Sequence, residues 1–160
     1  NVARVARSPN GRLSRLGPVE VTDHSLPGRI SGRGVLMARF GEGAEGLTVA
    51  VAHLSLGANS RRSQLAFIGE LLSDHPHAVL MGDFNCVPDT PEMDLLYKRT
   101  RLRPPAFCVP TFPSWRPQRA IDHILVSEGL RADNARAMPA ANSDHLALAM
   151  DIDVPGSALR

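Results

Sequence analysis

The residues best suited to chemistry are the carboxylate of Asp83 and the amide of Asn85, which follow an apolar run at 79–81 and Gly82. Side chains two residues apart on a strand share a face, so Asp83 and Asn85 are expected to project together while Phe84 turns into the core. Polar groups at the carboxyl end of a buried strand are typical of ligand sites in open α/β sheets. Because Gly, Asp and Asn also form turns, this stretch alone fits a strand that ends in a turn equally well.

Three further strand-like segments carry an acid or an imidazole near one end. The residues concerned are His53, Asp122, and Asp144 with His145. A single histidine is more often a hydrogen-bonded core residue than a catalyst, and Asp144 could merely cap a turn. Asp122 lies in an apolar run, where an unpaired buried carboxylate would cost several kcal/mol, so we expect it to have a histidine partner.

Together, these strand ends would supply carboxylates for a hard divalent cation, an imidazole held by a carboxylate, and an amide donor. Metal-assisted attack on phosphorus needs a cation for the phosphate oxygens, a base for water, and donors that bind the transition state. Zinc is disfavoured because no histidine pair or cysteine cluster has the usual spacing. The expected cofactor is therefore Mg²⁺ or Mn²⁺.

Composition restricts the function less sharply. A chain of 160 residues with 43% hydrophobic residues has the size of one domain with a buried core. No apolar run approaches the roughly 20 residues of a membrane span, and no signal peptide is recognisable, so the default localisation is cytoplasmic. The net charge of +2 does not identify a nucleic-acid binder, although nearly all basic residues are arginines, which suit phosphate as well as carboxylate partners. Cys86 and Cys108 are expected to be buried or half-buried free thiols.

The elements that would position the polar residues are mostly strands. Alternating or continuous apolar runs predict strands at 34–40, 47–54, 78–84, 120–126, 131–137 and 145–152. The first two form an antiparallel hairpin with a longer loop. A helix is expected to follow a cap at Asn59-Ser60 and to run to about Ser73, and Thr90-Pro91 begins a second, short helix.

Residues 99–119 contain five prolines and the only tryptophan, Trp115. Proline cannot donate to a strand ladder, so this segment is excluded from the centre of a sheet. Trp115 could stack on a base or a lipid headgroup, but a tryptophan among prolines more often packs against the edge of the domain.

Four segments, in this order, resemble the endonuclease/exonuclease/phosphatase family, which includes deoxyribonuclease I-like phosphoesterases. They are Ala52-His53-Leu54, Gly82-Asp83-Phe84-Asn85, Ile121-Asp122-His123-Ile124 and Ser143-Asp144-His145. The resemblance extends from about Asn10 to Asp153 and implies an α/β (α+β) fold. The fold would be a deoxyribonuclease I-like four-layer sandwich, with two packed, mostly antiparallel sheets flanked by helices. Residues 1–160 are expected to form a single domain that is incomplete at its amino end.

The resemblance also implies roles for the matching residues. Asp83 would polarise or deprotonate the attacking water, and Asn85 would orient that water and the phosphate. His145 would contact the scissile phosphate, with Asp122 fixing its tautomer and raising its basicity.

Two further matching residues would complete the site. Asp144 would help to hold the metal, directly or through water, and His53 matches the histidine that deoxyribonuclease-like members use as general acid. The amino end departs from the family pattern, because Asn1, Asn10 and Glu20 lack the surroundings of the early asparagine and of the glutamate that is the main metal ligand. The chain therefore resembles the carboxyl-terminal part of such an enzyme.

The predicted function is hydrolysis of a phosphodiester or phosphomonoester by activated water, with in-line attack at phosphorus and a divalent metal. The substrate would be nucleic acid, a phospholipid headgroup or a small phosphoester, and the protein is expected to be a monomer. We expect the 160-residue chain itself to be weakly active or inactive. The alternative is an inactive family member or fragment that acts as a binding module, with nucleic acid as one candidate ligand.

Overall fold

The computed structural model describes residues 10–28, 32–139 and 142–160, so Asn1 lies outside the described residues. The strands are β1 (Glu20–Ser25), β2 (Gly34–Phe40), β3 (Leu47–His53), β4 (His77–Asp83), β5 (Asp122–Val126), β6 (Arg131–Met138) and β7 (Ala147–Asp153). The helices are α1 (Ala58–Leu72), α2 (Pro91–Arg99) and the short 3₁₀ helix η1 (Gly156–Leu159). These elements form the mixed α/β fold with two sheets that the sequence predicts.

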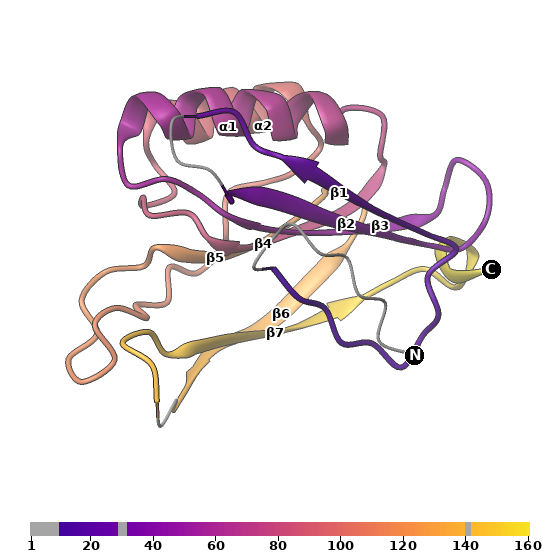
Figure 1. Cartoon of the computed structure of the whole chain (residues 1–160). Coiled ribbons are helices and arrows are strands. Elements are labelled where there is room, and N and C mark those ends of the chain that lie inside the picture. The colour runs from indigo at the N-terminus through magenta and orange to yellow at the C-terminus, as the bar shows by residue number, and fades with distance from the viewer. Residues whose placement is uncertain (1–9, 29–31, 140–141) are drawn as a thin grey trace.

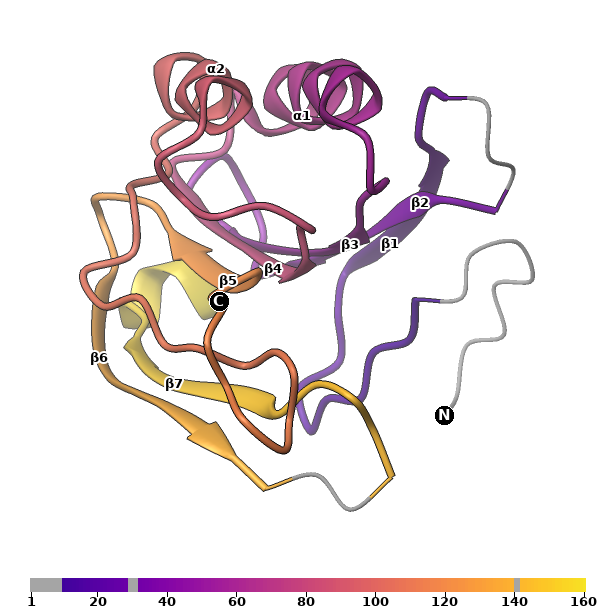
Figure 2. The same ribbon diagram turned by 90° about the vertical axis from the view of Figure 1, so that its left-hand side faces the viewer.

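The larger sheet has the strand order β1-β2-β3-β4-β5, and β6 pairs with β7 in a second sheet. All neighbouring pairs are antiparallel except β3 and β4, which run parallel. Parallel neighbours need a crossover connection, and α1 provides it. Figures 1 and 2 show α1 and α2 covering one face of the larger sheet and β6-β7 lying against the other.

Both faces of β4 are covered, which explains the continuous apolar run that ends at Met81. Leu80 is in the core cluster between the sheet and the helices, where Leu65 and Ile68 of α1 are fully buried. Val79, the preceding residue, is in the cluster beneath β6-β7. A strand covered on both sides has no polar face and reads as an uninterrupted hydrophobic segment. The polar residues of β4 are consequently confined to its two ends, at His77 and Asp83.

Several local expectations need correction. The cap predicted at Asn59-Ser60 is wrong, because α1 begins at Ala58 with Gly57 as N-cap and without a side-chain cap bond. The second helix begins at Pro91 with Thr90 as N-cap, as predicted. The last strand begins at Ala147 and not at residue 145. Cys86 is buried as expected, whereas Cys108 is exposed.

None of the helices in the described part of the chain has the length and apolar character needed to span a bilayer.

Candidate active site

Three of the predicted site residues lie in one row across neighbouring strands. His53, the last residue of β3, is in register with Asp83, the last residue of β4. Asp83 is in turn in register with Asp122, the first residue of the antiparallel strand β5. Residues in register project from the same face of a sheet, so the two carboxylates and the imidazole are neighbours. The polar residues that terminate three apolar runs therefore meet at one edge of the sheet.

Gly82 permits the close approach of β4 to β3 at this edge. It has a φ of +138°, and a Cβ atom added there would lie 1.9 Å from the carbonyl oxygen of Ala52. Only glycine adopts such a backbone conformation without strain. Beyond the strand, the backbone N–H of Leu54 donates to the carbonyl oxygen of Asp83 at 2.9 Å, which fixes the two strand ends to each other.

Asp83 and Asn85 are brought together by a turn and not by an extended strand. Asn85 has a left-handed φ of +54°, which asparagine tolerates better than most residues. Its backbone N–H donates to Asp83 Oδ1 at 2.9 Å, and its side-chain amide donates to the carbonyl of Leu54 at 2.9 Å. Phe84 is fully buried, as expected. The stretch is thus a turn that carries polar groups, so the two interpretations of it are compatible.

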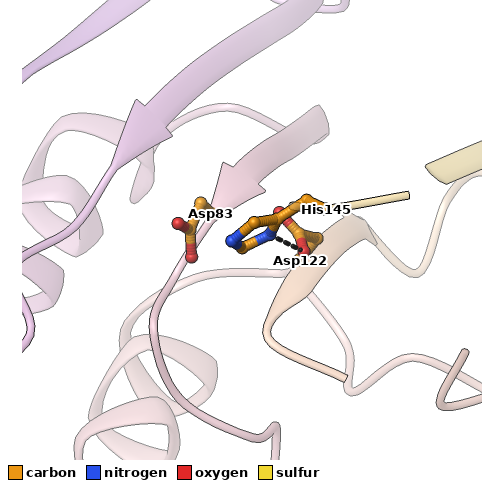
Figure 3. Close-up of side chains that lie close together, drawn as sticks. All are labelled: Asp83, Asp122 and His145. Carbon is orange, nitrogen blue, oxygen red and sulfur yellow. Dashed lines mark hydrogen bonds and ion pairs between the residues drawn. The ribbon is translucent and has the colours of Figure 1, made fainter. Parts of the chain in front are cut away.

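The histidine partner expected for Asp122 is His145. Its Nδ1–H donates to Asp122 Oδ2 at 2.7 Å, and the hydroxyl of Thr111 donates to the same oxygen at 2.5 Å. Figure 3 shows the ring of His145 between Asp83 and Asp122. Burial lowers the pKa of His145, but the hydrogen bond and charge of Asp122, with smaller effects of Asp83 and Asp144, raise it above its usual value. Because Nδ1 is engaged, Nε2 is the nitrogen available to a ligand.

The loop before β5 holds His145 in place. Leu146 N–H donates to the Thr111 carbonyl at 2.8 Å, and Ser114 N–H donates to the Asp144 carbonyl at 2.7 Å. The ring of Phe112 lies 4.8 Å from that of His145. Sequence reasoning assigned no role to Thr111, and the only signal was its place in the segment leading to Asp122.

His53 lies on the other side of Asp83, with its Nε2 atom 3.3 Å from Asp83 Oδ2. Burial and then the positive charge of Arg33 lower the pKa of His53, against the opposing effect of Asp83. These effects favour the neutral imidazole. Arg33, just before β2, was missed by sequence reasoning because no local pattern separates it from the other arginines.

The group most suited to a metal ion comprises Asp83, Asp122 and His145, whose ligand atoms all lie within 4.8 Å of one another. Asp144 is exposed and is not in this group. Hard cations such as Mg²⁺ accept carboxylate oxygens and complete their shell with water and substrate phosphate. The carboxylates of Asp83 and Asp122 fit such a cation in kind, while the ring of His145 is already bonded to Asp122.

His123 has a structural role, distinct from the roles expected of His53 and His145. It is buried, and its Nε2–H donates to the carbonyl oxygen of Cys86 at 2.7 Å. Its ring makes an edge contact with Phe84. Burial lowers the pKa of His123 despite this hydrogen bond and the nearby carboxylates, which favours the neutral ring.

Known structures with the same fold were found, whereas a search of the curated proteins gave no match. A functionally unknown conserved protein from Enterococcus faecalis is 20% identical with a TM-score of 0.71, over 86% of this chain and 66% of that one. A mannosyl-6-phosphatase from Bacteroides thetaiotaomicron is 17% identical with a TM-score of 0.67, over 86% and 67%. TDP2 from D. rerio, complexed with a single-strand DNA product, is 16% identical with a TM-score of 0.63, over 86% and 68%.

At these identities the likeness establishes the fold, and the chain spans about two thirds of the length of these structures. The family model described as "Endonuclease/Exonuclease/phosphatase family" matches residues 7–145, which include all six predicted site residues. The chain belongs to the endonuclease/exonuclease/phosphatase family.

Proposed function

We propose that this site hydrolyses a phosphodiester or phosphomonoester with the help of Mg²⁺ or Mn²⁺, by in-line attack of an activated water at phosphorus. The observation that carries the proposal is the cluster in which Asp122 holds His145 at 2.7 Å beside Asp83. Membership of a family of phosphoesterases supports the class of reaction. One structural neighbour is named as a mannosyl-6-phosphatase and another is complexed with a single-strand DNA product, so a sugar phosphate and nucleic acid are both candidate substrates.

A divalent cation would be held by the carboxylates of Asp83 and Asp122, with Asp144 assisting from its exposed position directly or through water. When bound, the cation would neutralise phosphate oxygens and polarise the water. His145 is less suited to bind it through Nδ1, because that atom donates to Asp122.

The protein side chains would carry out proton transfer, orientation of the reactants and stabilisation of charge. Asp83 would accept a proton from the water, and Asn85, whose backbone is tied to Asp83, would orient that water and the phosphate. His145 would contact a phosphate oxygen through Nε2. Its raised pKa favours the protonated ring, which is the form that stabilises negative charge. Asp122 would fix the tautomer and orientation of that ring, as a carboxylate does in a catalytic triad.

His53 would protonate the leaving oxygen. Free of substrate, the neutral ring is favoured because burial and then Arg33 lower the pKa of His53. A bound phosphate would offset the charge of Arg33 and thereby favour protonation of His53. A protonated His53 beside Asp83 is then available as the general acid.

The test is hydrolysis of bis-p-nitrophenyl phosphate and p-nitrophenyl phosphate, with Mg²⁺, with Mn²⁺ and with EDTA, by the product of the complete open reading frame. We expect turnover that requires the metal and that falls by at least about a hundredfold in Asp83→Ala and in His145→Ala. Asp133→Ala, on the exposed sheet β6-β7, is the matched control. Turnover that persists in EDTA and in both site variants would refute the proposal. A folded protein with no turnover on either substrate would favour a binding module.

A further inference from the structure

The loop between α2 and β5 ends in a small hairpin that helps to hold His145, and the proposed chemistry gives the tip of this hairpin no role. The hairpin consists of residues 112–119. The Phe112 N–H donates to the carbonyl of Arg119 at 3.2 Å, and the Arg119 N–H donates to the carbonyl of Phe112 at 3.0 Å. Within the hairpin, the Arg116 N–H donates to the carbonyl of Pro113 at 3.0 Å. These bonds give the tip a defined conformation.

The 112–119 hairpin is hydrogen-bonded directly to the segment 143–145, which carries Asp144 and His145. Ser114 donates twice to it, from its N–H to the carbonyl of Asp144 at 2.7 Å and from its hydroxyl to the carbonyl of Ser143 at 2.8 Å. Phe112 packs against the ring of His145. Whatever the tip of the hairpin binds is therefore held at a fixed position relative to His145.

Trp115 stands at this tip with 77% of its surface exposed. The expectation that it packs against the edge of the domain is wrong. A tryptophan normally buries most of its large apolar surface, and an aromatic ring left exposed on an ordered loop is available for contact with a partner.

Two arginines accompany this ring. Arg116 and Arg119 are exposed, and neither forms an ion pair within residues 10–28, 32–139 and 142–160. Arg119 instead lies over Phe112, with its guanidinium carbon 5.9 Å from the ring centroid. The hairpin thus presents an open aromatic face and two uncompensated positive charges next to the proposed phosphate site.

We propose that the 112–119 hairpin recognises single-stranded nucleic acid, by stacking an unpaired base on Trp115 and contacting neighbouring phosphates through Arg116 and Arg119. The inference rests on the proposed function and names the substrate class for it. An aromatic platform within a positively charged surface is the usual means of binding single strands, because every base offers a π-face and every linkage a phosphate. A paired base inside a duplex has no free face for Trp115. A small sugar phosphate would leave the arginines without phosphate partners.

Because Trp115 is the only tryptophan of the 160-residue chain, the fluorescence of that chain reports on the contacts of Trp115. A short oligothymidylate would be titrated into the protein in EDTA, beside an oligomer of equal length with tetrahydrofuran abasic sites throughout. We expect oligothymidylate to quench the fluorescence and to bind about tenfold more tightly than the abasic oligomer. Equal affinity for the two oligomers would overturn the inference, and so would quenching by phosphatidylcholine vesicles but not by oligothymidylate.

Variants are compared by the anisotropy of labelled oligomers. Trp115→Ala should lose the preference for bases and Trp115→Phe should largely keep it. Joint replacement of Arg116 and Arg119 by alanine should weaken binding of both oligomers and reduce the salt dependence. Phe107→Ala removes an exposed aromatic side chain outside the hairpin and should change nothing. A base preference that survives in Trp115→Ala would contradict the inference.

The two proposals can fail separately. Binding in EDTA requires no turnover, so a protein that hydrolyses nothing can still show the preference for bases. Conversely, metal-dependent hydrolysis by a protein that binds the abasic oligomer equally well would leave the proposed function intact and remove only the assignment of substrate.

Discussion

Replacement of Gly82 by alanine tests whether the approach of β4 to β3 builds the site. The added Cβ atom would lie 1.9 Å from the carbonyl oxygen of Ala52, whereas Cβ contacts below 3.0 Å essentially do not occur. The two strands must therefore shift by about 1.1 Å, the difference between these distances. The φ of +138° adds strain, because side chains rarely tolerate it.

The expected loss in the free energy of unfolding has two sources, the unfavourable φ and the backbone clash. An unfavourable φ of this kind costs about 1–3 kcal/mol, and the backbone clash brings the total to roughly 4 kcal/mol or more, in the range of exceptionally damaging substitutions. For a chain of this size, about 4 kcal/mol lowers the Tm by roughly 8–16 °C. The shift also displaces Asp83 from His53, and a misplacement of about 1 Å costs on the order of 10²-fold in rate.

The assay is thermal unfolding together with hydrolysis of bis-p-nitrophenyl phosphate, normalised to the folded fraction. Gly17→Ala is the matched control, because a Cβ atom there meets nothing within 4 Å and the substitution should stay within about 0.5 kcal/mol of the wild type. A Gly82→Ala protein with the Tm and normalised rate of the wild type would refute the argument that this strand contact is required.

Three further predictions follow from the site and its surroundings. Asp122→Asn removes the charge and weakens the hydrogen bond that raise the pKa of His145, so an NMR titration should give a lower pKa, and the rate should fall about 10–100-fold; an unchanged pKa would contradict the proposed pairing. The pKa of His123 is lowered in the folded state, so this residue leaves stability unaffected above about pH 6.5 and reduces it as the pH falls from there through the folded pKa. Urea unfolding should show a smaller loss of stability on acidification in His123→Gln, and an identical pH dependence would exclude His123 as its source. Calorimetry on the 160-residue chain should detect only weak Mg²⁺ binding, because its metal-suited group has just two carboxylates, and tight binding would contradict this.

Most of the sheet could be predicted because its strands are long apolar runs that end in polar residues. The same property made the candidate site predictable. His53, Asp83 and Asp122 each mark a strand end, and strands in register place such ends together. The partner of Asp122 followed from the cost of burying a lone carboxylate. Element ends were less predictable, because Gly57 starts α1 through its backbone and leaves no side-chain cap to recognise.

Contacts made by loops could not be predicted from the sequence. Thr111 reaches Asp122 only because the loop folds back onto the segment of His145, and no periodicity encodes that contact. The exposure of Trp115 was mispredicted for a related reason, since packing preference alone places a tryptophan inside. The left-handed backbone of Asn85 likewise replaced a simple strand alternation with a turn.

The central claim is that water, activated beside Asp83, attacks phosphorus directly. Hydrolysis of a phosphorothioate diester of one configuration at phosphorus, in water enriched in ¹⁸O and by the product of the complete open reading frame, tests this claim most directly. We predict that ¹⁸O appears in the phosphorothioate product and not in the alcohol, and that the configuration at phosphorus is inverted, because direct in-line attack is a single displacement. Label in the alcohol would mean attack at carbon, and retention of configuration would mean two displacements through a covalent phosphoenzyme. Either result would contradict the proposed mechanism.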